Sequence, residues 1–219
     1  MIKKIYISLI FALFSLGAFG QRTSFFETWM SAGVQKKIGE LNINLEEGWR
    51  VREFYLSRQN YTDLGLMWKI NSNFSMGGGY RLSFKNSYVK YEEVSNRFYF
   101  DLQAQYKFGD FTISYRPRLQ YSSSTDESDY GLFSQTYLRG KLKLEYKISK
   151  KISIDAGHEL FWYLVPSNSF INENRMSLLG EYKITKDFAV AAGYLLRYYV
   201  QVSNPISIHI LSVDLTYKF

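Results

Sequence analysis

Hydrophobic and polar residues alternate one by one along most of the chain. In residues 98–108 every second side chain is aromatic or aliphatic, and the side chains between them are mostly polar or charged. The same period returns in residues 111–121 and 188–198. A period of two places alternate side chains on opposite faces of an extended strand, whereas a helix would mix Phe with Arg on one side. The pattern therefore predicts β-strands.

Eleven segments follow this rule, and most of them are 10 to 16 residues long. Strands in globular proteins average about 5–6 residues, whereas a tilted strand that crosses a bilayer needs about 9–11. The lengths therefore favour a β-barrel that spans a membrane. The predicted strands are 26–37, 40–53, 61–70, 74–85, 96–108, 111–121, 133–148, 152–163, 173–184, 188–199 and 206–219.

A tripeptide made of an aromatic residue, Lys and an apolar residue repeats every 35 to 40 residues. Each copy before the last is followed by two or three turn residues and another alternating segment, which is the pattern of a β-hairpin. The repeat therefore marks strand ends. Its copies are Trp68-Lys69-Ile70, Tyr106-Lys107-Phe108, Tyr146-Lys147-Ile148, Tyr182-Lys183-Ile184 and Tyr217-Lys218-Phe219, with a weaker one at Lys36-Lys37-Ile38.

The apolar faces of the predicted strands cannot all point into a barrel. They carry about fifty residues, most of them large, while the interior of about eight strands is just filled by its own side chains. We therefore expect the apolar faces to contact lipid and the polar faces to line the lumen. The first aromatic residue of each copy then lies at the level of a membrane interface and forms an aromatic girdle. This girdle consists of Trp68, Tyr106, Tyr146, Tyr182 and Tyr217.

The two ends of the barrel are expected to differ. Short turns follow the tripeptides and are assigned to the periplasm, and the longer connections, 86–95, 122–132 and 166–172, are assigned to the cell exterior. Six segments then run toward the periplasm and five run away from it, although single-chain bacterial barrels have even strand counts. Either the first segment lies in the lumen or is only partly paired, or one strand escapes detection. We expect about 10–12 strands in an antiparallel up-and-down barrel.

The N-terminus has the layout of a secretory signal peptide. Lys3 and Lys4 precede an apolar run, residues 5–16, that is shorter than the roughly 20 residues of a spanning helix. Ala18-Phe19-Gly20 predicts cleavage before Gln21. We therefore expect a signal peptide over residues 1–20 and a single barrel domain over residues 21–219.

Composition excludes several classes of function. The chain has no Cys, so it has no disulfide framework and no thiolate metal site. Its formal net charge of +7 is mild and is not gathered into a basic block, so no nucleic-acid partner is expected. We expect no metal and no cofactor, because the two histidines, His158 and His209, lie far apart in the sequence.

The predicted lumen face is rich in charge. Two interpretations remain open: a sealed core in which the charges pair, and a water-filled lumen that attracts anions as Arg and Lys rings do in anion pores. The densest cationic cluster is Arg116, Arg118, Arg139, Lys141 and Lys143, and the expected acidic partners are Asp101, Glu145, Asp155 and Glu159. Glu47 falls on the lipid face, which suggests a β-bulge near Gly48.

An outer-leaflet lipid hydrolase is the enzyme alternative. Such an enzyme would resemble outer-membrane phospholipase A or the lipid A deacylases, which place a Ser and a His together on the lipid-facing wall, since the His takes the proton of the nucleophile. The deacylases have the Ser two residues after the His. His158 and His209 fall on that face, but neither is followed two residues later by a Ser. We therefore expect no enzymatic activity.

The last strand ends with alternating apolar residues and a terminal aromatic residue. It resembles the sorting signal that outer-membrane proteins present to the barrel-assembly machinery, and the resemblance implies that this machinery is a partner during insertion. The residues that carry it are Leu211, Val213, Leu215, Tyr217 and Phe219.

Residues 28–53, TWMSAGVQKKIGELNINLEEGWRVRE, resemble the start of an uncharacterised family of small outer-membrane β-barrels of Bacteroidetes, a family known only as a domain of unknown function. HELFW at 158–162 and NENR at 172–175 are similar to it as well. The resemblance implies a β-barrel in the outer membrane of a Gram-negative bacterium, in contact with lipid, and we expect it to be a monomer. The expected role is structural, binding or weakly permeating, with a narrow anion-preferring pore as the alternative.

Overall fold

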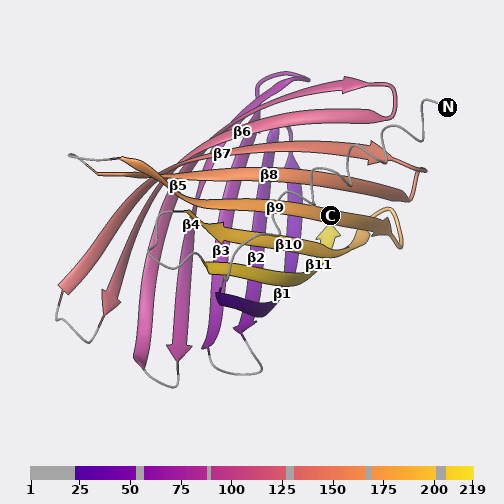
Figure 1. Cartoon of the computed structure of the whole chain (residues 1–219). Coiled ribbons are helices and arrows are strands. Elements are labelled where there is room, and N and C mark those ends of the chain that lie inside the picture. Colours follow the sequence, from indigo (N-terminus) through magenta and orange to yellow (C-terminus); the bar gives the residue numbers. More distant parts are fainter. Residues whose placement is uncertain (1–22, 53–56, 88–89, 127–130, 166–168, 201–205) are drawn as a thin grey trace.

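All eleven predicted strand segments form strands, and these strands pair in sequence order around a closed barrel (Figure 1). The computed structural model describes residues 23–52, 57–87, 90–126, 131–165, 169–200 and 206–219. The predicted signal peptide, residues 1–20, lies outside these ranges. The strands are β1 (Thr23–Ile38), β2 (Leu41–Arg52), β3 (Ser57–Lys69), β4 (Phe74–Ser87), β5 (Lys90–Phe108), β6 (Phe111–Asp126), β7 (Gly131–Lys147), β8 (Ile152–Leu164), β9 (Phe170–Lys183), β10 (Phe188–Tyr199) and β11 (Ile206–Lys218).

The barrel closes through a parallel pair, which explains its odd strand number. β1 pairs with β11 in parallel, with Thr23 opposite Ile206 and Gln35 opposite Lys218, while every other neighbouring pair is antiparallel. Both interpretations of the odd count were wrong, because β1 is paired with β2 and β11 over most of its length and the barrel is complete with eleven strands in the described residues. Ser24 and Ser207 meet across this seam with their hydroxyl oxygens 3.1 Å apart.

The tripeptide repeat marks one end of the barrel, called the turn end below. Three of its turns are built alike, because the residue after the tripeptide accepts two backbone N–H bonds through its side chain. Asn71 Oδ1, Ser149 Oγ and Thr185 Oγ1 bond the backbone nitrogens two and three residues further on. The other two turns have two residues and begin with Gly39 or Gly109, each at φ 59°, a value that glycine adopts without a steric penalty.

The opposite end, called the loop end below, differs from the prediction. β4 continues to Ser87 and β5 begins at Lys90, and β6 continues to Asp126 before β7 begins at Gly131, so most of the predicted loops 86–95 and 122–132 are strand. Of 166–172, the part from Phe170 belongs to β9. Sequence periodicity fails there because both faces of the strand ends are polar, although backbone pairing continues. The expected contrast between short turns and long loops is therefore much weaker than predicted.

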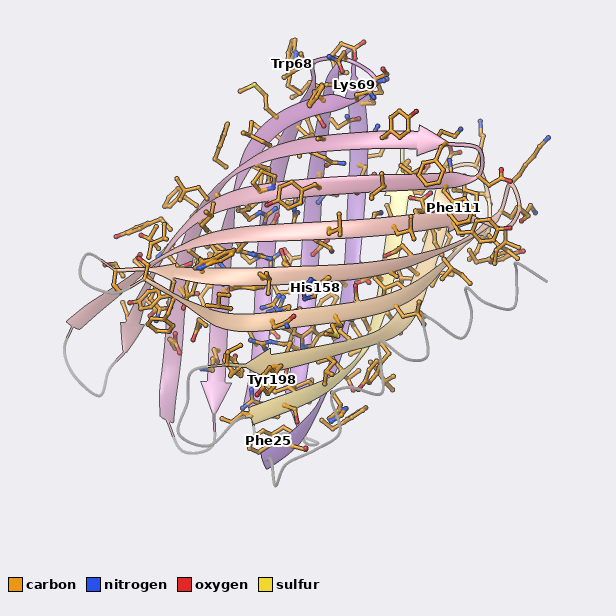
Figure 2. All side chains as sticks on the ribbon, turned by 45° about the horizontal axis from the view of Figure 1, so that its top comes forward. Phe25, Trp68, Lys69, Phe111, His158 and Tyr198 are labelled. Carbon is orange, nitrogen blue, oxygen red and sulfur yellow. The ribbon has the colours of Figure 1, made fainter. Side chains whose placement is uncertain are left out.

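The apolar faces form the outer wall, as predicted. Large hydrophobic side chains such as Phe100, Leu119 and Leu142 are among the exposed residues, whereas Asp63, Asp101 and Glu159 are buried. Figure 2 shows side chains on both surfaces of the strands, with Trp68 and Lys69 at the turn end of β3. The described residues contain no helix long and apolar enough to cross a membrane.

The predicted bulge near Gly48 is absent from the described strands. The register between β1, β2 and β3 runs through Glu47 and Gly48 without a shift. Glu47 stays on the outer face and accepts a hydrogen bond from Thr62 at 2.6 Å. Register shifts occur instead at Lys85/Ser87 and at Phe161/Trp162.

Candidate functional site

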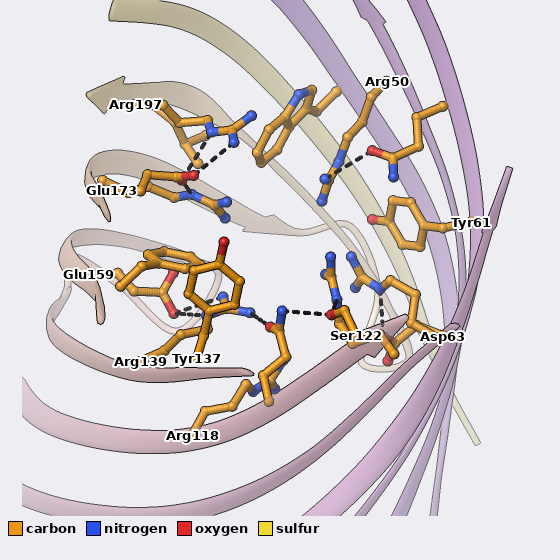
Figure 3. A pocket seen from close by; sticks show the side chains of 18 of the residues that line it. Arg50, Tyr61, Asp63, Arg118, Ser122, Tyr137, Arg139, Glu159, Glu173 and Arg197 are labelled. Atoms are coloured by element: carbon orange, nitrogen blue, oxygen red, sulfur yellow. Dashed lines mark hydrogen bonds and ion pairs between the residues drawn. The ribbon is translucent and has the colours of Figure 1, made fainter. Parts of the chain in front are cut away.

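The barrel encloses a charged cavity of about 690 Å³ (Figure 3). Its lining includes eleven Arg and Lys and seven Asp and Glu, an excess of four positive charges, or three when the buried Asp101 behind the lining is included. The cavity extends toward the loop end, where Lys85, Glu93 and Ser124 line it. The lysines at the turn end of the strands do not contribute to the lining, so the cavity lies closer to the loop end than to the turn end. These lysines are Lys37, Lys69, Lys107, Lys147, Lys183 and Lys218.

Three members of the predicted cationic cluster are held by two of the predicted acidic partners. Arg118 donates through Nε and Nη2 to the two oxygens of Asp101, both at 2.6 Å. Arg139 donates to Glu159 Oε1 at 2.8 Å, and Arg116 lies between the two acids, 3.3 Å from Glu159 and 3.8 Å from Asp101. Their positive charges are thus largely compensated by the two carboxylates.

The remaining cluster members lie closer to the turn end. Lys143 forms an ion pair with Glu145 at 3.6 Å, and neither side chain lines the cavity. Asp155 has no ion pair among the described residues, and it too lies outside the lining. Lys141 lines the cavity and has no ion-pair partner in the described part of the chain. The predicted cationic cluster is therefore divided: Arg116, Arg118, Arg139 and Lys141 line the cavity, and Lys143 lies between the cavity and the turn end.

A second network joins the seam to β9 and β10. Arg197 donates to both oxygens of Glu173, at 3.0 and 2.8 Å, and Arg175 also bonds Glu173. Glu27 accepts a 2.8 Å bond from Arg52 Nε and lies 3.9 Å from Arg197. Five arginine and glutamate side chains from β1, β2, β9 and β10 are thus linked across the closing strands.

A third network lies on β2, β3, β4 and β5. Asp63 accepts bonds from Arg81 and from the Tyr99 hydroxyl, both at 2.7 Å, and the Tyr61 hydroxyl donates to Glu46 at 2.8 Å. The ring of Tyr61 lies directly on Gly48, because a Cβ there would be 2.1 Å from the Tyr61 ring carbon Cζ. Gly48 is therefore required by the close approach of an aromatic ring rather than by a bulge.

Two cavity arginines have no carboxylate partner among the described residues. Arg50 has only Gln59 Oε1 at 3.4 Å as a hydrogen-bond acceptor, and its buried Nε has none. Arg97 has only the Ser122 hydroxyl at 3.3 Å. The alternation of the strands places Arg50 and Arg97 on the lumen face, but it cannot single them out, because it gives the face of a side chain and not the partner that the register brings opposite it.

A ring of lysines at the turn end was also missed, although the repeat contained the signal. The middle residue of each tripeptide follows an outward residue, which is aromatic in every copy except Lys36-Lys37-Ile38, so alternation places it on the lumen side. One such lysine lies at or next to the end of each strand that runs to the turn end, and these strands alternate with the others around the barrel except at the seam, where β1 and β11 are neighbours. The ring consists of Lys37, Lys69, Lys107, Lys147, Lys183 and Lys218.

The predicted girdle residues lie on the outer wall near the turn end. Trp68, Tyr106, Tyr146, Tyr182 and Tyr217 are all exposed. Phe111 stacks on Tyr146 with ring centroids 4.7 Å apart, and Phe108 stacks on Phe111 at 5.5 Å. The residues of the predicted sorting signal, Leu211, Val213, Leu215, Tyr217 and Phe219, are also exposed and face outward along β11.

The two histidines lie on different strands of the barrel. His158 lies on β8 (Figure 2), three strands from His209 on β11, whose Nδ1 bonds the Tyr194 hydroxyl at 2.5 Å. No Ser–His hydrogen bond occurs among the described residues. Within the same residues no group of three or more acidic or histidine side chains could hold a metal ion.

Comparisons with known proteins complete the description. Among solved structures, the chain is similar to the KdgM porin, with 16% identity over 75% of this chain and 81% of that chain and a TM-score of 0.48. It is also similar to the translocator domain of the autotransporter NalP from Neisseria meningitidis (13% identity, 79% and 74% covered, TM-score 0.45). A third is the anion-selective porin from Comamonas acidovorans (12% identity, 80% and 52% covered, TM-score 0.37).

A search of curated proteins finds no match. The family described as "Protein of unknown function (DUF2490)" matches residues 26–205, which is most of the chain and includes all three segments that carry the resemblance noted above. The chain therefore belongs to the DUF2490 family.

Proposed function

We propose that this barrel resides in the outer membrane of a Gram-negative bacterium, where it binds small anions in its lumen and lets them pass slowly, without catalysing a reaction. The cationic excess around the 690 Å³ cavity carries the proposal. Arginine and lysine rings favour anions in pores, and the lysine ring at the turn end adds a second such layer. The ion-pair networks narrow the lumen, so the expected conductance is small.

The location is supported by the outer wall. Exposed apolar side chains cover it, and an aromatic band lies near the turn end, as in barrels that contact lipid. We assign the turn end to the periplasm because the C-terminal residues that resemble the sorting signal end there. In this proposal the chain is a monomer, and the barrel-assembly machinery inserts it.

Single-channel recording in planar bilayers tests the permeation part. We expect small conductance steps, and a reversal potential in a KCl gradient that has the sign of chloride preference. The Lys186→Gln variant, which removes a charge from an exposed turn, should give the same sign. No steps at any voltage would reject permeation and favour the sealed, ion-paired barrel.

Incubation with phospholipid vesicles tests the absence of catalysis. Fatty-acid release should stay at the level of protein-free vesicles, because no histidine forms a hydrogen bond with a serine in the described residues. Release by the wild type would contradict the proposal. Its loss in a His158→Ala, His209→Ala double variant would then assign the activity to the histidines.

A further inference from the structure

Arg50 is a poorly satisfied arginine in the cavity wall. Its guanidinium lies 4.0 Å from the ring centroid of Trp29 and 5.0 Å from that of Tyr61. Its Nε is buried with no partner, and its one acceptor is Gln59 Oε1 at 3.4 Å. The two rings fix the plane of the guanidinium while most of its donors stay unused.

Arg97 is in a similar state on β5. Its Nε donates to the Ser122 hydroxyl at 3.3 Å, a long bond to a neutral acceptor that is shared with Gln120. Asp63 is the nearby carboxylate, but it is already bonded to Arg81 and Tyr99. Among the described residues, neither Arg97 nor Arg50 forms an ion pair.

The two side chains face one cavity. Both line it, and both have Arg81 and Arg175 as charged neighbours. In Figure 3 Arg50 points into the open centre of the barrel, and Ser122, the partner of Arg97, lies below it in the same half of the view. Positive charge from several strands is thus directed at a single space without enough carboxylates to balance it.

Such a space suits a divalent oxyanion. A guanidinium presents a planar fork of donors that matches a carboxylate or a phosphate, and charge-assisted bonds of this kind are the strong ones. Arg50 and Arg97 together leave two positive charges without a carboxylate partner in the described part of the chain, which matches a ligand that carries two negative charges. The cavity also falls within the size range of sites that enclose small organic molecules, about 300–1,000 Å³.

We propose that Arg50 and Arg97 form a binding site for a small organic dianion that carries carboxylate or phosphate groups and reaches the cavity from the loop end. This site deepens the proposed function and depends on it only in requiring a lumen that solutes can enter. The ion-paired arginines Arg118, Arg139 and Arg197 form its wall and are not its primary ligands.

Isothermal titration of the purified barrel in detergent micelles tests the site, with succinate, inorganic phosphate and chloride as probes. We expect succinate or phosphate to bind at least about tenfold more tightly than chloride, and each of Arg50→Gln and Arg97→Gln to weaken that binding about tenfold or more. Lys186→Gln should bind like the wild type. Gel electrophoresis shows whether each variant is folded, because a folded barrel migrates more slowly after heating than before.

Arg50→Lys and Arg97→Lys provide a second measurement if a glutamine variant does not fold. Each keeps the charge but loses the planar fork, so part of the affinity should be lost while chloride binding is unchanged. Equal affinity in wild type and variants, or no binding of either dianion, would overturn the proposal. The titration measures binding and does not depend on ion flow through the barrel. A barrel that conducts but does not bind the dianions therefore refutes only the Arg50–Arg97 site, and a barrel that binds them without conducting refutes only permeation.

Discussion

At the scale of single residues, the lumen is organised by which acid each arginine meets. Asp101 is only 2% exposed, and it receives two 2.6 Å bonds from Arg118. Removing one partner of a buried ion pair leaves the other charge without compensation, and this is usually more costly than the pair is stabilising. The paired arginines therefore depend on their acids for stability.

We predict that Asp101→Asn lowers the free energy of unfolding by about 3–5 kcal/mol, because Arg118 keeps its charge and loses its carboxylate. Urea titration of the barrel in lipid vesicles, followed by tryptophan fluorescence, measures the change. The same substitution in the exposed turn, Asp110→Asn, should stay within about 0.5 kcal/mol of wild type. Equal stability of the two variants would contradict the prediction.

Gly48 gives a steric prediction at the same scale. A methyl group there overlaps the ring of Tyr61, so Gly48→Ala should move that ring and weaken its bond to Glu46. We expect a loss of about 1–3 kcal/mol in the same titration, the usual cost of overpacking. Gly180→Ala is the control, because a Cβ there meets nothing closer than 3.9 Å.

At the scale of elements, the strands and turns were largely readable from sequence. Alternation located all eleven strands, and the tripeptide repeat located the hairpin turns. The loop-end extensions of β4 to β7 were not visible, because a strand with water on both faces has no reason to alternate. The parallel pairing of β1 with β11 could not be predicted from the alternation either. It depends on which two strands keep an unpaired edge once all the hairpins have formed.

The pairing of β1 with β11 leads to a prediction that does not depend on the proposed function. The chain has no Cys, so a Ser24→Cys, Ser207→Cys variant introduces the only two thiols, at positions whose hydroxyl oxygens are 3.1 Å apart. We expect a disulfide that changes gel mobility without reductant. A Ser24→Cys, Ser212→Cys variant should stay reduced, because Ser212 pairs with Trp29 instead. Cross-linking of the second pair alone would reject this register.

At the scale of the whole molecule, the sequence predicted the kind of barrel better than its site. It placed the charges inside, but the residues it singled out, Arg116, Arg118 and Arg139, are those that carboxylates hold. Arg50 and Arg97 remained hidden among the other lumen arginines. Ion pairing is decided by register and side-chain reach, neither of which a single sequence shows.

The lysine ring predicts how charge at the turn end affects permeation. Lys37 and Lys36 are neighbours on β1 that face the lumen and the exterior, respectively, and Lys36 lies over the Phe219 ring. Lys37→Gln combined with Lys69→Gln and Lys107→Gln should shift the reversal potential away from chloride preference. Lys36→Gln should leave it unchanged. Equal shifts in the two variants would show that the ring does not act on the permeating ion.

The parallel seam also decides where the two extremities of the barrel are found. β1 and β11 both begin at the loop end, so Thr23 and Phe219 lie at opposite mouths. A short epitope inserted before Thr23 and another appended after Phe219 would then report on different compartments. With the turn end in the periplasm, antibodies added to intact cells should label the first epitope and reach the second only after the envelope is broken.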